Sequence, residues 1–145
     1  MAEDTINTCS KELKINWKPT KTENLQLHGY LENEYEHSTY LQYGTDEVIL
    51  REIQRENPDL VEYIHPHLPY TKAEVVFAVR YEMDLHLEDF LSRRTRSLLL
   101  DAKASIECSY EVAQIMAKEL GCNNSWVEDE VKNFKLLAEN YLIPD

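Results

Sequence analysis

The densest hydrophobic pattern runs from Leu68 to Asp101, and we expect the other segments to pack around it. Thr71 and Glu74 have the spacing of a capping box just after Pro69, which predicts a helix beginning near Lys72. Apolar side chains nearly encircle this predicted helix, a pattern typical of a central helix. They are Ala73, Val75, Val76, Phe77, Ala78, Val79 and Met83.

Arg80 lies on the same predicted helix, on the side that carries Val76 and Phe77. A guanidinium group in an apolar environment is very costly unless it has a partner. The predicted environment of Arg80 therefore indicates a buried ion pair with a carboxylate.

The second half of the stretch combines apolar residues at helical spacing with several arginines, and it predicts another helix that packs on the first. Arg93 and Arg96 would share a face, and guanidinium groups match phosphate oxygens well. Together with Arg94 they form a candidate phosphate or interface cluster. The alternative, which the many nearby acids favour, is that the arginines form ion pairs that hold helices together. The carboxylates available are Glu82, Glu88, Asp89 and Asp101.

The N-terminal part is predicted to contain two helices joined by an irregular connector. Residues 1–13 have a helix-forming composition with early acids, as a helix N-terminus favours. No cap residue precedes them, so we expect the first turn of this helix to lie upstream. Residues 14–44 hold proline, glycine and many polar residues without a sustained period, which indicates the connector. Thr45 or Asp46 then caps a short helix that ends at Asn57.

The C-terminal part is predicted to be helical as well. The segment from Asp101 to Gly121 reads as two helical pieces, with Ser109 as a cap between them and the final glycine as a left-handed end. Ser125 and Glu128 have the spacing of a capping box and predict the start of a last amphipathic helix. Glu130 interrupts the apolar stripe of that helix.

The fold class follows from these patterns. No segment alternates for long with the two-residue period of a strand, and the chain has only three glycines. We therefore predict an all-α fold, a compact domain of about five or six helices with no sheet. Residues 1–145 are expected to form a single domain, in which 45–145 is the helical core.

Composition restricts the partners. The 145 residues carry a formal net charge of −12 and a sequence pI near 4.8, so their surface repels the phosphates of nucleic acids and anionic membranes. A basic partner or simple solubility would explain the acidity. No apolar run approaches the roughly 18 residues needed to span a bilayer, and the N-terminus lacks the pattern of a signal peptide. We expect a cytoplasmic protein without a membrane span.

Candidate catalytic or metal-binding residues do not converge by spacing, so we predict no catalytic set in this chain. The three cysteines are far apart, which favours reduced thiols over disulfides or a catalytic cysteine. His65 and His67 could begin a zinc site, but no further ligands stand at a recognisable spacing, so we favour loop histidines and no metal. The connector tyrosines could stack on bases, but the acids among them favour packing on the domain. These tyrosines are Tyr30, Tyr35, Tyr40 and Tyr43, and the cysteines are Cys9, Cys108 and Cys122.

Several strings of sequence resemble a known family. LPYTKAEVVFAVRYEM, EDFLSRRTRSLLLDAKASIE and the opening MAEDTIN are similar to the C-terminal region of aerobic FAD-dependent glycerol-3-phosphate dehydrogenases, the alpha-glycerophosphate oxidase family. The similarity is tightest over residues 65–101 and 116–121. Lys72 stands where the family more often has an aromatic residue. His86 stands where it usually has a threonine that could cap the next helix.

The resemblance implies a parent enzyme that oxidises sn-glycerol 3-phosphate to dihydroxyacetone phosphate on FAD and passes the electrons to a quinone or to oxygen. The glycine-rich turn of a dinucleotide site is missing here. We therefore expect a non-catalytic C-terminal domain, continuous through residues 1–13 with an upstream flavin-binding domain. The parent would lie in the cytoplasm or peripherally at the inner face of the cell membrane. The alternatives left open are a free-standing acidic interaction module and a homodimer formed through exposed apolar surface.

Overall fold

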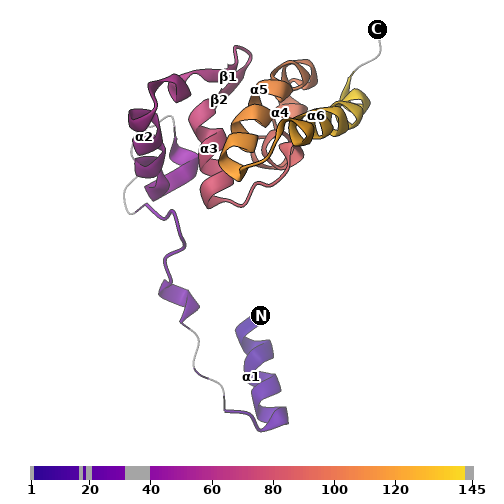
Figure 1. The fold of residues 1–145 in the computed structure, drawn as a ribbon. Helices are drawn as coiled ribbons and strands as arrows, with labels where there is room; N and C mark the ends of the chain where they lie inside the picture. Colours follow the sequence, from indigo (N-terminus) through magenta and orange to yellow (C-terminus); the bar gives the residue numbers. More distant parts are fainter. Residues whose placement is uncertain (1, 17, 19–20, 32–39, 143–145) are drawn as a thin grey trace. The chain divides into compact units, whose positions relative to one another are not determined.

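The fold is described from a computed structural model, which covers residues 2–16, 18, 21–31 and 40–142 (Figure 1). Contacts within the chain divide it into two units, Met1–Thr45 and Asp46–Asp145. Most of the described residues are helical, as predicted.

The first unit contains the N-terminal helix. This helix, α1 (Ala2–Leu13), carries Glu3 and Asp4 in its first turn, where the helix dipole favours acids. None of its residues is buried. Two short 3₁₀ helices follow, η1 (Thr22–Asn24) and η2 (Leu41–Asp46).

Two glycines allow backbone segments of this unit to cross closely. The Thr45 N–H donates to the Gly29 carbonyl oxygen at 3.3 Å. A Cβ atom on Gly44 would lie 1.7 Å from that same oxygen, and Gly44 has a positive φ of 55°. Only glycine fits there without a shift of the backbone.

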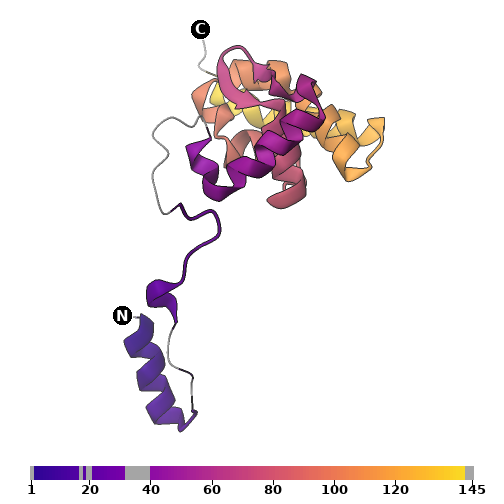
Figure 2. The same ribbon diagram turned by 90° about the vertical axis from the view of Figure 1, so that its left-hand side faces the viewer.

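The second unit begins with α2 (Glu47–Glu56), which ends at Asn57 as predicted. Asp46 stands at the N-cap position, but its side chain makes no capping hydrogen bond. The Asn57 side chain then accepts a hydrogen bond from the Asp59 N–H and starts the 3₁₀ helix η3 (Pro58–Val61). Figure 2 shows α2 in front of the later helices.

A small sheet follows, so the prediction of no sheet is wrong. Strands β1 (Tyr63–His65) and β2 (Leu68–Thr71) form an antiparallel hairpin. Tyr63 pairs with Thr71 and His65 with Leu68, with an irregularity between the two pairs. Strands this short cannot display a two-residue period, and the hairpin forms where it packs on α5.

The helix α3 (Lys72–Tyr81) is central to the second unit, as its encircling apolar pattern predicted. The capping box is formed, and the Glu74 carboxylate accepts a hydrogen bond from the Thr71 N–H at 2.6 Å. Figure 1 shows α3 between α2 and α5, and it contacts both helices.

The chain between α3 and α5 is not the regular helix predicted. It contains a π-helix, η4 (Asp89–Arg94), and a short α-helix, α4 (Ser97–Leu100). The Thr95 N–H donates to the Phe90 carbonyl oxygen, five residues back, at 3.0 Å. Arg96 has a left-handed φ of 56° and separates the two helices. The regular spacing assumed for the arginines therefore does not apply.

The helix α5 (Ala102–Leu120) is continuous, so the prediction of two pieces is wrong. The Ser109 hydroxyl donates to the Ile106 carbonyl oxygen at 2.7 Å, which uses it within the helix rather than as a cap. Gly121 ends the helix with a φ of 71°, as predicted.

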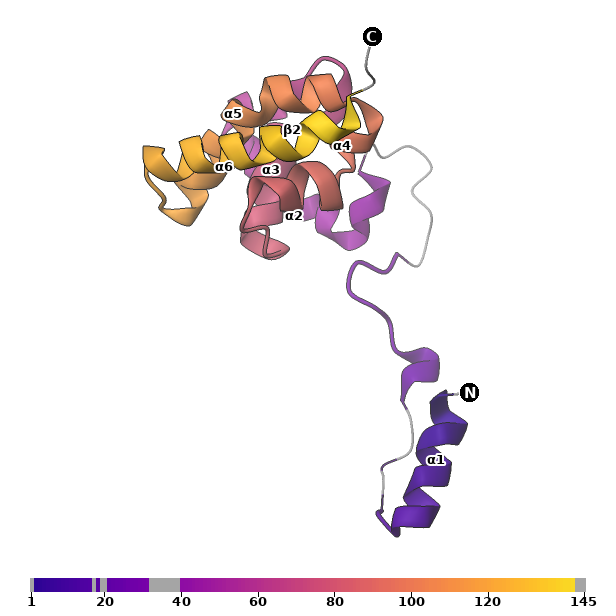
Figure 3. The ribbon, with the colours of Figure 1, turned by 90° about the vertical axis from the view of Figure 1, so that its right-hand side faces the viewer.

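The last long helix, α6 (Asn124–Ala138), lies alongside α5 (Figure 3). Its N-cap is Asn123, whose side-chain oxygen accepts a hydrogen bond from the Trp126 N–H at 3.1 Å. The prediction that Ser125 caps this helix is wrong, because an asparagine two residues earlier takes that position.

One apolar cluster joins the hairpin to the helices from α3 to α6. Phe90 and Leu91 are fully buried in it, so the π-helix belongs to the core. No helix in the described part of the chain combines the length and apolar character needed to cross a membrane.

Candidate functional site

The segment Glu82–Arg96 holds the arginine cluster together with unusual backbone. Met83 and Arg96 both have positive φ, at 61° and 56°. A left-handed residue with a side chain costs roughly 1–2 kcal/mol, and strained residues and π-helices often occur at functional sites. Glu82–Arg96 is therefore the candidate functional segment.

The predicted arginines do not act as one group. Arg93 pairs with Asp89 and, at 2.7 Å, with Glu88. Arg96 is exposed and has no ion pair within the part of the chain that the structure describes. Because Arg93 already pairs with two carboxylates, it is less able to bind a phosphate. The charge of Arg96 is not compensated by such a pair from the described residues.

Arg94 borders a hollow of about 450 Å³ on the surface of the second unit. Its Nε atom lies 3.0 Å from Glu82 Oε2, although the two are not aligned as a hydrogen bond. The residues that line this hollow, here named the Asp84 hollow, are Glu82, Met83, Asp84, Asp89, Arg93 and Arg94.

Asp84 is the most deeply buried carboxylate of the hollow. The residue is only 4% exposed, and its Oδ2 atom has no hydrogen-bond partner. Burial raises the pKa of Asp84, while Arg94 opposes this shift and Asp89 adds to it. Burial also raises the pKa of Glu82. The hollow therefore holds carboxyl groups whose charged form its arginines stabilise incompletely.

The Asp89 carboxylate holds the backbone turn that leads into the π-helix. Its Oδ2 atom accepts hydrogen bonds from the backbone N–H groups of His86, at 2.9 Å, and Leu85, at 3.2 Å. Burial acts to raise the pKa of Asp89, but these hydrogen bonds and Arg93 outweigh it, so the pKa lies below its usual value. Asp89 is therefore ionised near neutral pH.

Glu130 of α6 reaches the same loop from the opposite side. It accepts a hydrogen bond from the Leu87 N–H at 2.7 Å, and its other oxygen lies 2.9 Å from His86 Nδ1. Its side chain is mostly buried. The acid that interrupts the apolar stripe of α6 thus fixes the loop that leads into the π-helix.

His86 should make stability depend on pH. The hydrogen bond to Glu130 raises the pKa of His86 above its usual value, although burial opposes this. The pair therefore stabilises the fold fully below about pH 6.5, the usual pKa, and this contribution is lost as the pH rises through the folded-state value. Because the His86 side chain is largely exposed, we expect only about 0.5 kcal/mol.

The measurement is urea unfolding of the wild type and of His86→Asn at pH 6 and pH 8. The variant should lose the extra stability at pH 6, whereas His28→Asn, a control in the first unit, should retain it. An unchanged difference between the two pH values in His86→Asn would contradict the assignment.

Arg80 has a carboxylate partner but is not buried. Its Nε atom lies 2.6 Å from Glu119 Oε2 of α5, and a second guanidinium nitrogen lies 3.2 Å from the other oxygen. The Arg80 side chain is 43% exposed, so the predicted burial is wrong. The last turn of α3 lies at the surface, where the guanidinium keeps contact with water.

Other charged pairs fasten the hairpin and the start of α3 to α5. His65 Nε2 lies 3.1 Å from Glu107 Oε2, and Lys72 Nζ lies 2.6 Å from Glu111 Oε1. His67 pairs with a different acid, Asp101, at 3.3 Å. Among the described residues, no group of three or more His, Cys, Asp or Glu side chains is arranged to hold a metal ion.

The cysteines differ in exposure. Cys108 is buried in the core, and burial raises its pKa to about 12. Its thiol therefore stays protonated and unreactive at neutral pH. Cys9 and Cys122 are exposed and free.

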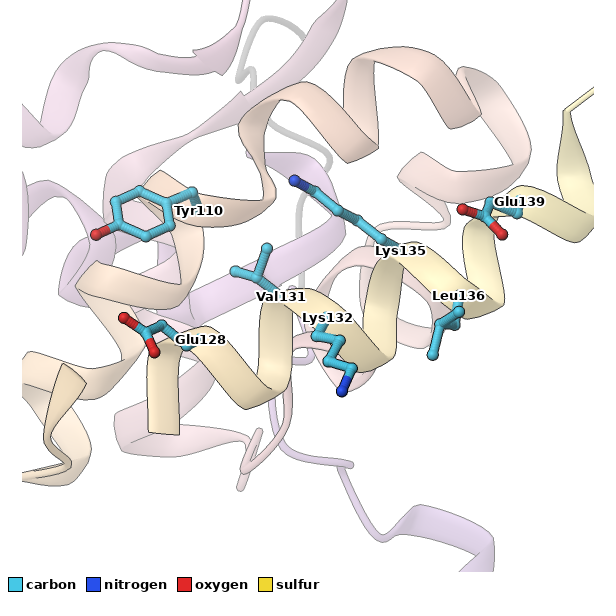
Figure 4. A pocket seen from close by; sticks show the side chains of 7 residues that line it. All are labelled: Tyr110, Glu128, Val131, Lys132, Lys135, Leu136 and Glu139. Atoms are coloured by element: carbon cyan, nitrogen blue, oxygen red, sulfur yellow. The ribbon is translucent and has the colours of Figure 1, made fainter. Parts of the chain in front are cut away.

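A second hollow, of about 420 Å³, lies between α5 and α6 (Figure 4). Figure 4 shows Tyr110 facing it from α5, with the other side chains carried by α6 and the residue after it. Two acids and two lysines line it, so it has no dominant charge. They are Glu128, Lys132, Lys135 and Glu139.

Sequence reasoning missed three residues of the candidate site: Asp84, Met83 and Glu130. The only signal was the interruption of the apolar stripe by Glu130, because a buried acid on such a stripe implies a hydrogen-bonding partner. Nothing in the local pattern indicated that Asp84 would be buried or that Met83 would adopt a left-handed conformation.

Comparison with known proteins covers most of the chain. Residues 12–127 match the model of a family described as the C-terminal domain of alpha-glycerophosphate oxidase. The chain is 29% identical to glycerol-3-phosphate dehydrogenase 2 of Mycobacterium tuberculosis, over 96% of this chain and 27% of the relative. It is 31% identical to the glycerol-3-phosphate dehydrogenase of Mycobacterium leprae, with the same coverage.

A relative from another organism gives a similar result. The probable mitochondrial glycerol-3-phosphate dehydrogenase of Dictyostelium discoideum is 31% identical, over 98% of this chain and 24% of the relative. The chain thus spans about a quarter of the length of these relatives. No solved structure matches.

The helical fold and these matches define the class of protein. It is a C-terminal domain of the kind found in glycerol-3-phosphate dehydrogenases. The chain belongs to the family of C-terminal domains of alpha-glycerophosphate oxidase. The candidate segment Glu82–Arg96 lies wholly within the matched residues.

Proposed function

We propose that the chain is a non-catalytic accessory domain of a cytoplasmic glycerol-3-phosphate dehydrogenase. The observation that carries this proposal is the family match over residues 12–127. In this proposal, sn-glycerol 3-phosphate is oxidised to dihydroxyacetone phosphate on FAD, in an upstream flavin-binding domain. That domain is the partner of this chain.

The described residues do not fit the flavin dinucleotide itself. A pyrophosphate site needs a glycine-rich turn that lets the backbone approach the phosphates. Gly44 is committed to its close contact with Gly29, and Gly121 ends α5. No chemical step is therefore assigned to this chain.

The proposed contribution is mechanical. The helix α1 has exposed apolar side chains, among them Ile6, which is 48% exposed, and Leu13, which is 63% exposed. Uncovered apolar surface on a helix is typical of an interface. We propose that α1 packs against the flavin-binding domain and supports its last flavin-contacting loop.

Reconstitution tests this proposal. The Mycobacterium tuberculosis relative, with the region matching this chain deleted, would be mixed with the 145-residue chain while dye reduction by glycerol 3-phosphate is followed. We expect activity or flavin retention only with both pieces. Ile6→Glu should abolish this gain of activity or flavin retention. Leu136→Glu makes a similar change at an exposed position of α6 and should not abolish it.

Other outcomes separate the alternatives. If the truncated relative is fully active and the added chain does not change its activity, the acidic interaction module becomes the better proposal. Arg96, the unpaired member of the arginine cluster, is the residue we propose to face the substrate or the partner. If Arg96→Ala leaves the KM for glycerol 3-phosphate and the assembly unchanged, that role is dropped. Light scattering on the same samples shows whether a homodimer forms.

A further inference from the structure

The Asp84 hollow has an excess of negative charge. Its lining contains three carboxylates and two arginines. One of these arginines, Arg93, is also paired with Glu88, which lies outside the lining. A group that enters the hollow therefore meets uncompensated negative charge, which favours a cation.

The hydrogen-bonding needs of the hollow favour a guanidinium group over an ammonium group. Asp84 Oδ2 is an enclosed acceptor atom without a hydrogen bond, whereas Glu82 Oε2, which also lacks an aligned hydrogen bond, lies 3.0 Å from Arg94 Nε. Buried acceptors normally have a donor, and an unpaired buried carboxylate is costly. A guanidinium group carries several N–H donors in one plane and can serve two acceptors at once, which an ammonium group does less well.

Met83 supplies the apolar part of the site. The residue lines the hollow, is 82% exposed and has a left-handed backbone. Exposed methionine is a soft contact surface, and the aliphatic stem of an arginine side chain packs on such surfaces.

We propose that the Asp84 hollow binds the guanidinium group of an arginine side chain presented by another polypeptide. Asp84 accepts hydrogen bonds from the guanidinium, and Met83 contacts the stem. The inference does not rest on the proposed function, because any polypeptide with a suitably exposed arginine could supply the group.

The test uses the intact 145-residue chain and two blocked amino acids. N-acetylarginine methylamide is titrated into ¹⁵N-labelled protein, and N-acetylcitrulline methylamide, its neutral near-isostere, is titrated in parallel. We expect saturable amide shifts confined to residues 82–94 with the arginine probe, and binding at least about tenfold weaker with citrulline.

Two variants complete the test. Asp84→Asn keeps the size of the side chain and removes a buried, unpaired charge, so the variant should fold with an unchanged or higher Tm. It should weaken binding of the arginine probe at least about tenfold. Asp129→Asn, an exposed change on α6, should leave binding unchanged.

Three results would overturn the proposal. Equal binding of the citrulline probe would indicate a hydrated polar site that is indifferent to charge, since a buried water can satisfy such acceptors. Full affinity in Asp84→Asn would remove Asp84 from the site. The absence of saturable shifts near residues 82–94 would show that the hollow binds no guanidinium group.

Discussion

Phe90→Ala should lower the free energy of unfolding by about 3–5 kcal/mol, the usual cost of truncating a buried phenylalanine. Phe90 is fully buried in the core cluster, although it lies in the π-helix. The loss approaches the total stability of a small domain, so Phe90→Leu, at roughly 1–1.5 kcal/mol, provides a variant that stays folded. Urea unfolding followed by circular dichroism measures both.

Tyr110→Ala is the matched control, since it removes an aromatic ring that is half exposed on α5. Its expected cost is below about 1 kcal/mol. If Phe90→Ala cost no more than this control, the π-helix would not be an integral part of the core.

Glu74→Ala should have the second largest effect and lower the free energy of unfolding by about 2–4 kcal/mol. The Glu74 carboxylate is 1% exposed and accepts hydrogen bonds from the Thr71 N–H and, at 3.0 Å, from the Thr71 hydroxyl. Alanine removes a helix cap and leaves a buried donor unsatisfied, and these costs add. Thermal and urea unfolding would measure the loss.

The control for this change comes from the second capping-box pattern of the sequence. Glu128 occupies the corresponding position after Ser125, but Asn123 caps α6 and Glu128 is exposed. Glu128→Ala should therefore change stability by no more than about 0.5 kcal/mol. Similar losses in the two variants would mean that Glu74 stabilises the fold only as a surface acid.

Local signals in the sequence correctly predicted several helix ends, because these depend on interactions between neighbouring residues. Thr71 and Glu74 start α3, Asn57 ends α2 and Gly121 ends α5, because caps depend on residues a few positions apart. The two identical-looking capping patterns show the limit of such reasoning. An asparagine two residues before Ser125 competes for the same helix start, and sequence spacing alone does not rank the two caps.

The hairpin, the π-helix and the burial of Asp84 depend on contacts between distant segments, so the sequence did not predict them. The hairpin is too short to have a period, and it forms where β1 meets α5. The π-helix lies between two left-handed residues, Met83 and Arg96. The loop that leads into it is held by a hydrogen bond from the Leu87 N–H to Glu130, 43 residues away. In the candidate site, the acids around the arginines were visible in the sequence. The burial of Asp84 was not, because it depends on how the turn after α3 folds back.

The helix α5 is held in two physically different ways, and this has a consequence for its response to salt. Towards α6 it packs through apolar side chains such as Met116 and Phe134. Towards the hairpin and α3 it adds a row of carboxylates, Glu107, Glu111 and Glu119, each facing a basic side chain. Dissolved ions screen charges over about 10 Å at 0.1 M but strengthen rather than weaken apolar contacts when they are kosmotropic. Rising ionic strength should therefore loosen the hairpin side of α5 first and leave its seam with α6 closed.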